Sequence, residues 1–155
     1  IANGYLYGGQ PQQALAVLED VQPPEKALEM RGLVAGNKAT CFLAAGEMDR
    51  AQTAMDELRR IAADRNCKKE FVQKARHTLG YLQLCMDIAR GRHADVGALQ
   101  KDFESSRAPL HRLDVQYRIA LALRHRGDRT GMEKSREYLL ENSGGTCYGE
   151  LARAL

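Results

Sequence analysis

The hydrophobic residues of this chain recur every three or four positions, and no stretch alternates apolar and polar residues. Spacing of three and four places side chains on one face of an α-helix, whereas a half-buried β-strand shows strict alternation. Residues 51–62 are the clearest case, because small and apolar residues fall on one side and charged residues on the other. The pattern therefore predicts an all-α protein.

The predicted helices are of two kinds. Residues 51–62 and 132–139 have one apolar face, whereas residues 71–88 and 110–123 are apolar over a wider arc. A helix that is apolar on several sides is covered on several sides. Alternation of the two kinds indicates stacked helical hairpins, in which one helix of each pair is sandwiched and the other faces solvent.

Four glycines punctuate this pattern, each at the end of a predicted helix. Glycine takes the left-handed backbone conformation at little cost, so it suits a tight turn between helices. A small or apolar residue follows five positions later in each case, in the pairs Gly9 and Ala14, Gly46 and Ala51, Gly91 and Val96, and Gly127 and Met132. We predict one helical-repeat domain over residues 1–155, with pairs at about 1–24, 25–66, 67–108 and 109–143 and a capping helix at 146–155.

At these residues the chain resembles the tetratricopeptide repeat family, whose unit is a helical hairpin. The best-matching unit runs from about Gly32 to Ala63 and carries a small residue, an aromatic, the turn glycine and a second small residue at Ala39, Phe42, Gly46 and Ala51. Pro109 stands about where the family ends a unit, but Val96 and Met132 replace its alanine, and the repeats are longer than the family's. The resemblance implies antiparallel hairpins stacked as a short right-handed α-α superhelix. The alternative is an irregular helical bundle with coincidental glycine spacing.

The resemblance also implies a concave surface, lined by the first helix of each pair, that binds peptides or partner helices. Counting back from each turn glycine gives the candidate partner-binding residues Asn3, Asn37, Thr40, Tyr81, Cys85, Tyr117, Arg118, Arg124 and His125. The same count also reaches Leu6, Leu33, Leu43, Thr78, Leu82, Ile88, Asp114 and Leu121. Tyrosine and arginine are frequent binding hot spots. Each of these residues has a plainer alternative as part of the core or of a solvated face.

Charge changes this picture only locally. The net charge is +3, but residues 107–136 hold eight of the basic residues and three acidic ones. A local excess of arginine favours an acidic protein or peptide partner. It also leaves nucleic-acid binding through this basic third as a lesser alternative.

The sequence contains no nucleotide-binding, zinc-protease or serine-hydrolase motif. We therefore expect no catalytic residue, no metal and no cofactor. His111 and Asp114, three apart on one predicted helix, are a histidine and a carboxylate able to pair, although a plain surface pair explains them as well. The four cysteines lack zinc-site spacing and are expected to be free thiols, which favours a cytoplasmic location. The longest apolar runs, five residues each, are too short to span a membrane.

The expected function is that of a non-catalytic scaffold that binds a protein or peptide. The chain starts at Ile1 and not at methionine, so an alternative is a ligand- or peptide-sensing regulatory module of a larger chain, either membrane-anchored or DNA-binding. One local question stays open. Gly36 and Asn37 either allow close packing of a helix or break it, and the sequence does not choose between these outcomes.

Overall fold

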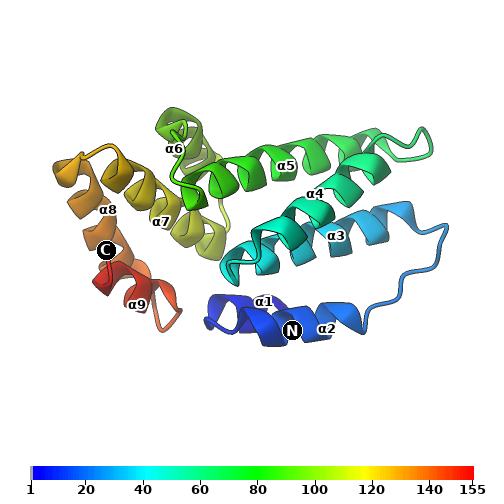
Figure 1. Cartoon of the computed structure of the whole chain (residues 1–155), viewed down its shortest axis with the longest axis horizontal. Coiled ribbons are helices and arrows are strands. Elements are labelled where there is room, and N and C mark those ends of the chain that lie inside the picture. The colour runs from blue at the N-terminus through cyan, green and yellow to red at the C-terminus, as the bar shows by residue number, and fades with distance from the viewer. Residues whose placement is uncertain (1) are drawn as a thin grey trace. The chain divides into compact units, whose positions relative to one another are not determined.

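The structure is a computed structural model that describes residues 2–155. Within this range the chain forms nine α-helices and no strand, which confirms the all-α prediction (Figure 1). The helices are α1 (Ala2–Tyr7), α2 (Pro11–Glu19), α3 (Leu28–Ala44), α4 (Met48–Ala62), α5 (Lys69–Ala89), α6 (Val96–Ser105), α7 (Pro109–His125), α8 (Arg129–Asn142) and α9 (Tyr148–Arg153). Within each part of the chain neighbouring helices pack together, α2 on α3 and α3 on α4, and likewise α6 on α7, α7 on α8 and α8 on α9, an arrangement compatible with a helical repeat.

The chain divides into two compact units. Unit 1 contains residues 2–6 and 10–86, and unit 2 contains residues 7–9 and 87–155. Helix α5 belongs to unit 1 except for its last residues. Each unit has its own buried cluster and is described by itself.

The four predicted turn glycines share one backbone geometry. Gly9, Gly46, Gly91 and Gly127 all have positive φ, between 67° and 77°. After each glycine, the next backbone N–H donates to the carbonyl five residues back, at 2.8–3.0 Å. This is the Schellman arrangement that ends a helix, and it accounts for glycine at each position. The sequence signal for these turns is confirmed.

Small residues then allow the second helix of a hairpin to approach the first. Ala14 and Ala51 are fully buried, and Val96 is 6% exposed. All three lie in the first turn or two of the helix that follows a turn glycine. A larger side chain there would separate the paired helices.

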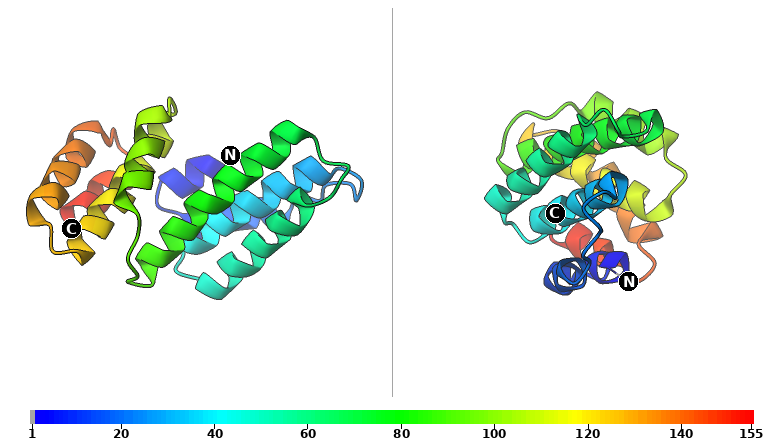
Figure 2. Two further views of the ribbon diagram at one scale, coloured as in Figure 1. Left: turned by 90° about the horizontal axis from the view of Figure 1, so that it is seen from above. Right: turned by 90° about the vertical axis from the view of Figure 1, so that its right-hand side faces the viewer.

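The core of unit 1 is built from α2, α3, α4 and α5. Figures 1 and 2 show α3, α4 and α5 lying alongside one another in this unit. Its largest fully buried side chains are Met55, Leu82 and Met86. A second cluster joins α3, α4 and α5 through Ala35, Leu58, Ile61, Phe71 and Ala75.

Helix α3 is continuous from Leu28 to Ala44, so Gly36 and Asn37 do not break it. Gly36 and Gly32 are both buried and provide the close packing that was the other possibility. A Cβ at Gly32 would overlap the tip of the Phe71 ring, and two further ring atoms would lie 3.1 and 3.3 Å away. The glycines of α3 therefore let α5 pack directly on the α3 backbone.

The core of unit 2 contains a buried polar cluster. The Tyr148 hydroxyl of α9 donates to the Asp114 carboxylate of α7 at 2.9 Å. Arg118, one turn further along α7, lies with Nε 3.3 Å from the same carboxylate oxygen. The Tyr148 ring packs between those of Tyr7 and Tyr117, with centroids 6.3 and 6.1 Å away. Burial and the Asp114 charge raise the pKa of Tyr148, so its hydroxyl stays protonated and keeps donating.

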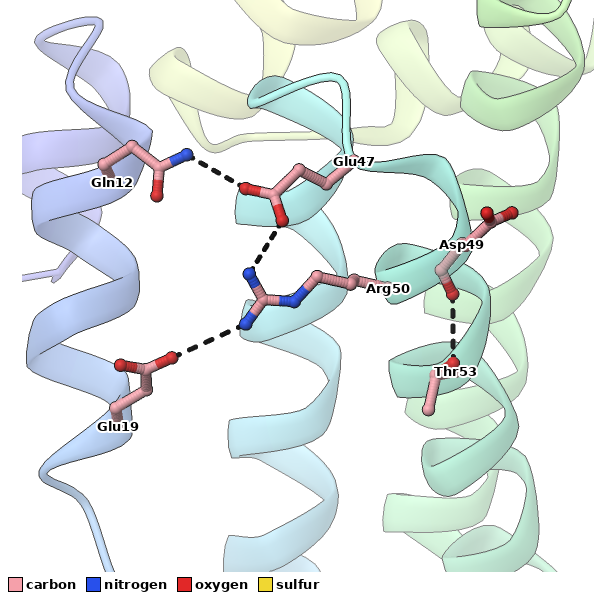
Figure 3. Close-up of polar contacts among 6 residues, drawn as sticks. All are labelled: Gln12, Glu19, Glu47, Asp49, Arg50 and Thr53. Carbon is pink, nitrogen blue, oxygen red and sulfur yellow. Dashed lines mark hydrogen bonds and ion pairs between the residues drawn. The ribbon is translucent and has the colours of Figure 1, made fainter.

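In unit 1, α2 is held to the α3–α4 turn by a charged network (Figure 3). Glu47 accepts from Gln12 of α2 at 2.9 Å and from Arg50 at 2.7 Å. Arg50 also lies 3.7 Å from Glu19 at the end of α2. Its guanidinium stands over the Phe42 ring, 4.2 Å from the centroid. The network complements the apolar contacts of α2.

This network makes a prediction for acid stability. The hydrogen bonds from Gln12 and Arg50 hold the pKa of Glu47 below its ordinary value of 4.5. A carboxyl group whose pKa is lower in the folded state stabilises the fold above its unfolded pKa. This contribution is lost as the pH falls through the folded value. We therefore expect Glu47→Gln to be less stable than the original chain at pH 7, and the difference to shrink below about pH 4.

Urea denaturation at both pH values measures this difference. Glu25→Gln is the matched control, because Glu25 is exposed and its carboxylate forms no ion pair within residues 2–155. A stability difference for Glu47→Gln that stays constant with pH would show that the network does not couple to protonation.

Candidate functional site

A hollow opens on unit 1 where α3, α4 and α5 meet. It has a volume of about 110 Å³, and its lining is mostly apolar. Helix α4 contributes Leu58, while the other lining residues come from α3 and α5. They are Gly32, Leu33, Gly36, Asn37 and Thr40 on α3 and Phe71, Lys74, Ala75 and Thr78 on α5.

Gly36 lines the hollow with its backbone, since it has no side chain. A Cβ at Gly36 would stand 3.5 Å from Leu58 Cδ2 and 3.8 Å from Thr78 Cγ2, which are ordinary contact distances. Both of these neighbours line the hollow. Glycine therefore leaves space at a place where alanine would fit.

The rim of the hollow carries both apolar and polar exposed side chains. Leu33 is 60% exposed, and Met30, one turn earlier on α3, is 51% exposed. Asn37 and Lys74 are exposed polar residues on opposite sides, on α3 and α5. An apolar floor under a few polar groups is typical of a binding site, because burial supplies affinity and the polar groups fix orientation.

The sequence predicted part of this site. Asn37 and Thr40 line the hollow together, and so do Leu33 and Thr78 from the same count. The Thr40 hydroxyl donates to the Gly36 carbonyl at 3.1 Å, so it is held against its own helix. Leu58, Phe71, Lys74 and Ala75 were missed. Extending the helical spacing back from Thr78 by one and two turns would have found the three on α5.

The remaining unit 1 candidates lie outside the hollow. Asn3 is exposed on α1. Tyr81 is half-buried and packs against the core cluster of this unit. Cys85 is 2% exposed and belongs to that cluster, so its side chain does not form a surface.

The candidates of unit 2 fall into two groups. Tyr117 packs on Tyr148, and Arg118 pairs with Asp114, so both belong to the buried polar cluster. Arg124 and His125 are exposed at the end of α7. Cations in the last turn are favourable there because of the helix dipole.

The histidine and carboxylate singled out on one helix do not pair with each other. His111 lies 3.0 Å from Asp102 of α6, through Nε2 and Oδ2. Asp114 instead faces Tyr148 and Arg118. The His111–Asp102 contact fastens α6 to α7, next to Arg112 over the Phe103 ring at 4.1 Å.

Three of the four thiols have a pKa above the ordinary value of a cysteine. None of the four cysteines in residues 2–155 forms a disulfide. Burial raises the pKa of Cys41 to about 11, and the pKa values of Cys67 and Cys147 are also raised, chiefly by burial. A reactive cysteine needs the opposite shift, because the thiolate is the nucleophile.

Several cations of the basic third make contacts inside unit 2. Arg126 donates to the Ala94 carbonyl at 2.5 Å and to His93 at 3.1 Å. Arg136 donates to the Ala152 carbonyl at 3.1 Å and pairs with Glu133. Together with Arg112 and Arg118, these residues have structural roles that account for part of the local charge.

Two features are absent from residues 2–155. Residues 2–155 contain no group of three histidine, cysteine or acidic side chains arranged to hold a metal ion. Over the same range, no helix combines the length and the apolar character that a membrane crossing requires. 

Comparison with known proteins does not assign a family, since no family model, no curated protein and no solved structure matches the chain significantly.

Proposed function

We propose that the chain is a non-catalytic, tetratricopeptide-like module that binds a protein segment in the hollow between α3 and α5. The observation that carries the proposal is the convergence of Leu33, Asn37 and Thr40 on α3 with Thr78 on α5 around one apolar floor. These positions were carried over from the resembling family by their spacing from each turn glycine, and they line one hollow. In the resembling family the first helices of successive pairs form the binding surface, and we take α3 and α5 to be such helices.

The exposed apolar residues support a protein partner. Leu33 at the rim of the hollow is 60% exposed, and Met30, one turn earlier on α3, is 51% exposed. Exposed apolar groups beside a pocket mark interaction sites more often than isolated ones do. The volume of about 110 Å³ is well below the roughly 300–1,000 Å³ of small-molecule pockets, which favours a side chain of a partner over a free ligand. With four free thiols, the proposed setting is a reducing compartment such as the cytoplasm.

Selection from a random peptide library displayed on phage tests this proposal. We expect the original chain to enrich a peptide motif and Leu33→Glu to lose it, because a charge at the rim would be desolvated by a bound peptide. Leu140→Glu is the control, since Leu140 is 40% exposed on α8 of unit 2. Thermal melts should show that both variants fold.

Two outcomes would count against the proposal. One is a failure of the original chain to enrich any motif. The other is equal enrichment by Leu33→Glu and the original chain, which would place binding elsewhere.

A further inference from the structure

Resting on the proposed function, we infer that the hollow receives one aliphatic side chain of a peptide that carries a carboxylate beside it. The aliphatic part follows from the floor and the volume. The carboxylate follows from the charge of the rim.

The floor fits a branched or linear aliphatic group. It consists of the glycine backbone of α3, the Leu58 side chain and the Phe71 ring. Leu58 is 2% exposed and Phe71 is 8% exposed. A dry cavity of roughly 150 Å³ lined by such residues holds benzene. A hollow of about 110 Å³ therefore suits leucine, methionine or valine better than a larger aromatic residue.

The rim carries one charge, and it is positive. Lys74 is the one ionisable residue among those that line the hollow, and it forms no ion pair within residues 2–155. The nearby carboxylates of α3 and α4 are paired, since Glu29 lies 3.9 Å from Lys68 and Glu57 lies 3.9 Å from Arg31. Glu70 stands one turn before Lys74 on α5 and does not line the hollow. A peptide carboxylate would therefore meet a cation here without displacing an existing pair.

Asn37 completes the rim on the α3 side. Its side-chain amide is both a donor and an acceptor, which is what the backbone of an extended peptide requires. It is exposed and faces the same hollow as Lys74. The three contacts together define an aliphatic residue with an acidic neighbour as the recognised feature.

Fluorescence polarisation with synthetic peptides tests this specificity. The probes share one central residue, varied among alanine, leucine and tryptophan, between two flanking glutamates or two flanking lysines. We expect leucine to bind about 30-fold more tightly than alanine and more tightly than tryptophan. Glutamate flanks should bind about 3-fold to 5-fold more tightly than lysine flanks, and Lys74→Glu should reverse this preference.

Gly36→Ala tests whether the side chain enters the hollow. The added methyl fits without a clash but occupies the floor of the hollow. We therefore expect the affinity for the leucine peptide to fall about tenfold. Gly80→Ala is the control on α5, because a Cβ there meets nothing within 4 Å. Both variants gain helix propensity, and thermal melts should show that neither is less stable than the original chain.

The outcomes separate this inference from the proposed function. Unchanged affinity in Gly36→Ala, or no preference among central residues, would overturn the inference while peptide binding itself stands. A charge preference that survives Lys74→Glu would overturn its acidic part. Failure of the phage selection would remove the proposed function as well.

Discussion

We expect Asp114→Ala to lower the free energy of unfolding by about 3 kcal/mol, the largest effect of any single change considered for this chain. The Asp114 side chain is 11% exposed and Arg118 is 16% exposed, so both charges are largely removed from water. Removing the carboxylate would leave a cation and the Tyr148 hydroxyl without the oxygen they share. Breaking a buried pair in this way is costly because the desolvation of the remaining charge is no longer offset.

Thermal unfolding followed by circular dichroism measures this loss. For a chain of this size, each kcal/mol lowers the melting temperature by about 2–4 °C. Glu137→Ala is the control, since Glu137 is exposed on α8 of the same unit. It should change stability by no more than about 0.5 kcal/mol. An Asp114→Ala variant that melts with the original chain would show that the cluster does not hold α9 in place.

A double-mutant cycle identifies the partner. Tyr148→Phe removes only the hydroxyl and should cost about 2 kcal/mol, because the hydrogen bond has a charged acceptor. The double variant with Asp114→Ala should cost less than the sum of the single changes, since both remove the same hydrogen bond. Strict additivity would contradict the Tyr148–Asp114 contact.

Gly32→Ala should destabilise unit 1, although alanine is the better helix former. The added methyl overlaps the Phe71 ring, which is 8% exposed and packed in a buried cluster. Overpacking of this kind costs about 1–3 kcal/mol, against a gain in helix propensity of at most about 1 kcal/mol. The net result is a loss of stability, and thermal unfolding measures it.

Gly80→Ala should change stability in the opposite direction. It has open space around its Cβ and lies inside α5, so it should raise stability by up to about 1 kcal/mol. Phe71→Leu should relieve part of the cost of Gly32→Ala in the double variant. If Gly32→Ala and Gly80→Ala shift the melting temperature in the same direction, the close contact of α3 with Phe71 is wrong.

Much of the fold could be predicted because its signals are local. The helices follow from apolar spacing within each segment. The four turns follow from glycine, because a positive φ of 67–77° excludes most other residues whatever the rest of the chain does. The small residues Ala14 and Ala51 are fixed by the same local geometry, since they lie next to the turn.

The candidate site was predicted only in part, for a related reason. Leu33, Asn37 and Thr40 share one face of α3, which the helical period determines. Their grouping with Lys74 and Phe71 depends on how α3 and α5 pack, and no local signal specifies that. The partner of Asp114 could not be predicted either, because Tyr148 is 34 residues away in the chain. Helical spacing pointed instead to nearer residues such as His111.

The sequence by itself therefore determined the helices and the turns between them, since these depend on neighbours within a few residues. Only the tertiary structure decided what the glycines of α3 do. Gly32 and Gly36 weaken an isolated helix, yet α3 is continuous, because Phe71 packs on the bare backbone and the burial of that ring outweighs the lost propensity. That same packing leaves the hollow beside Gly36, which no pattern along the chain predicts.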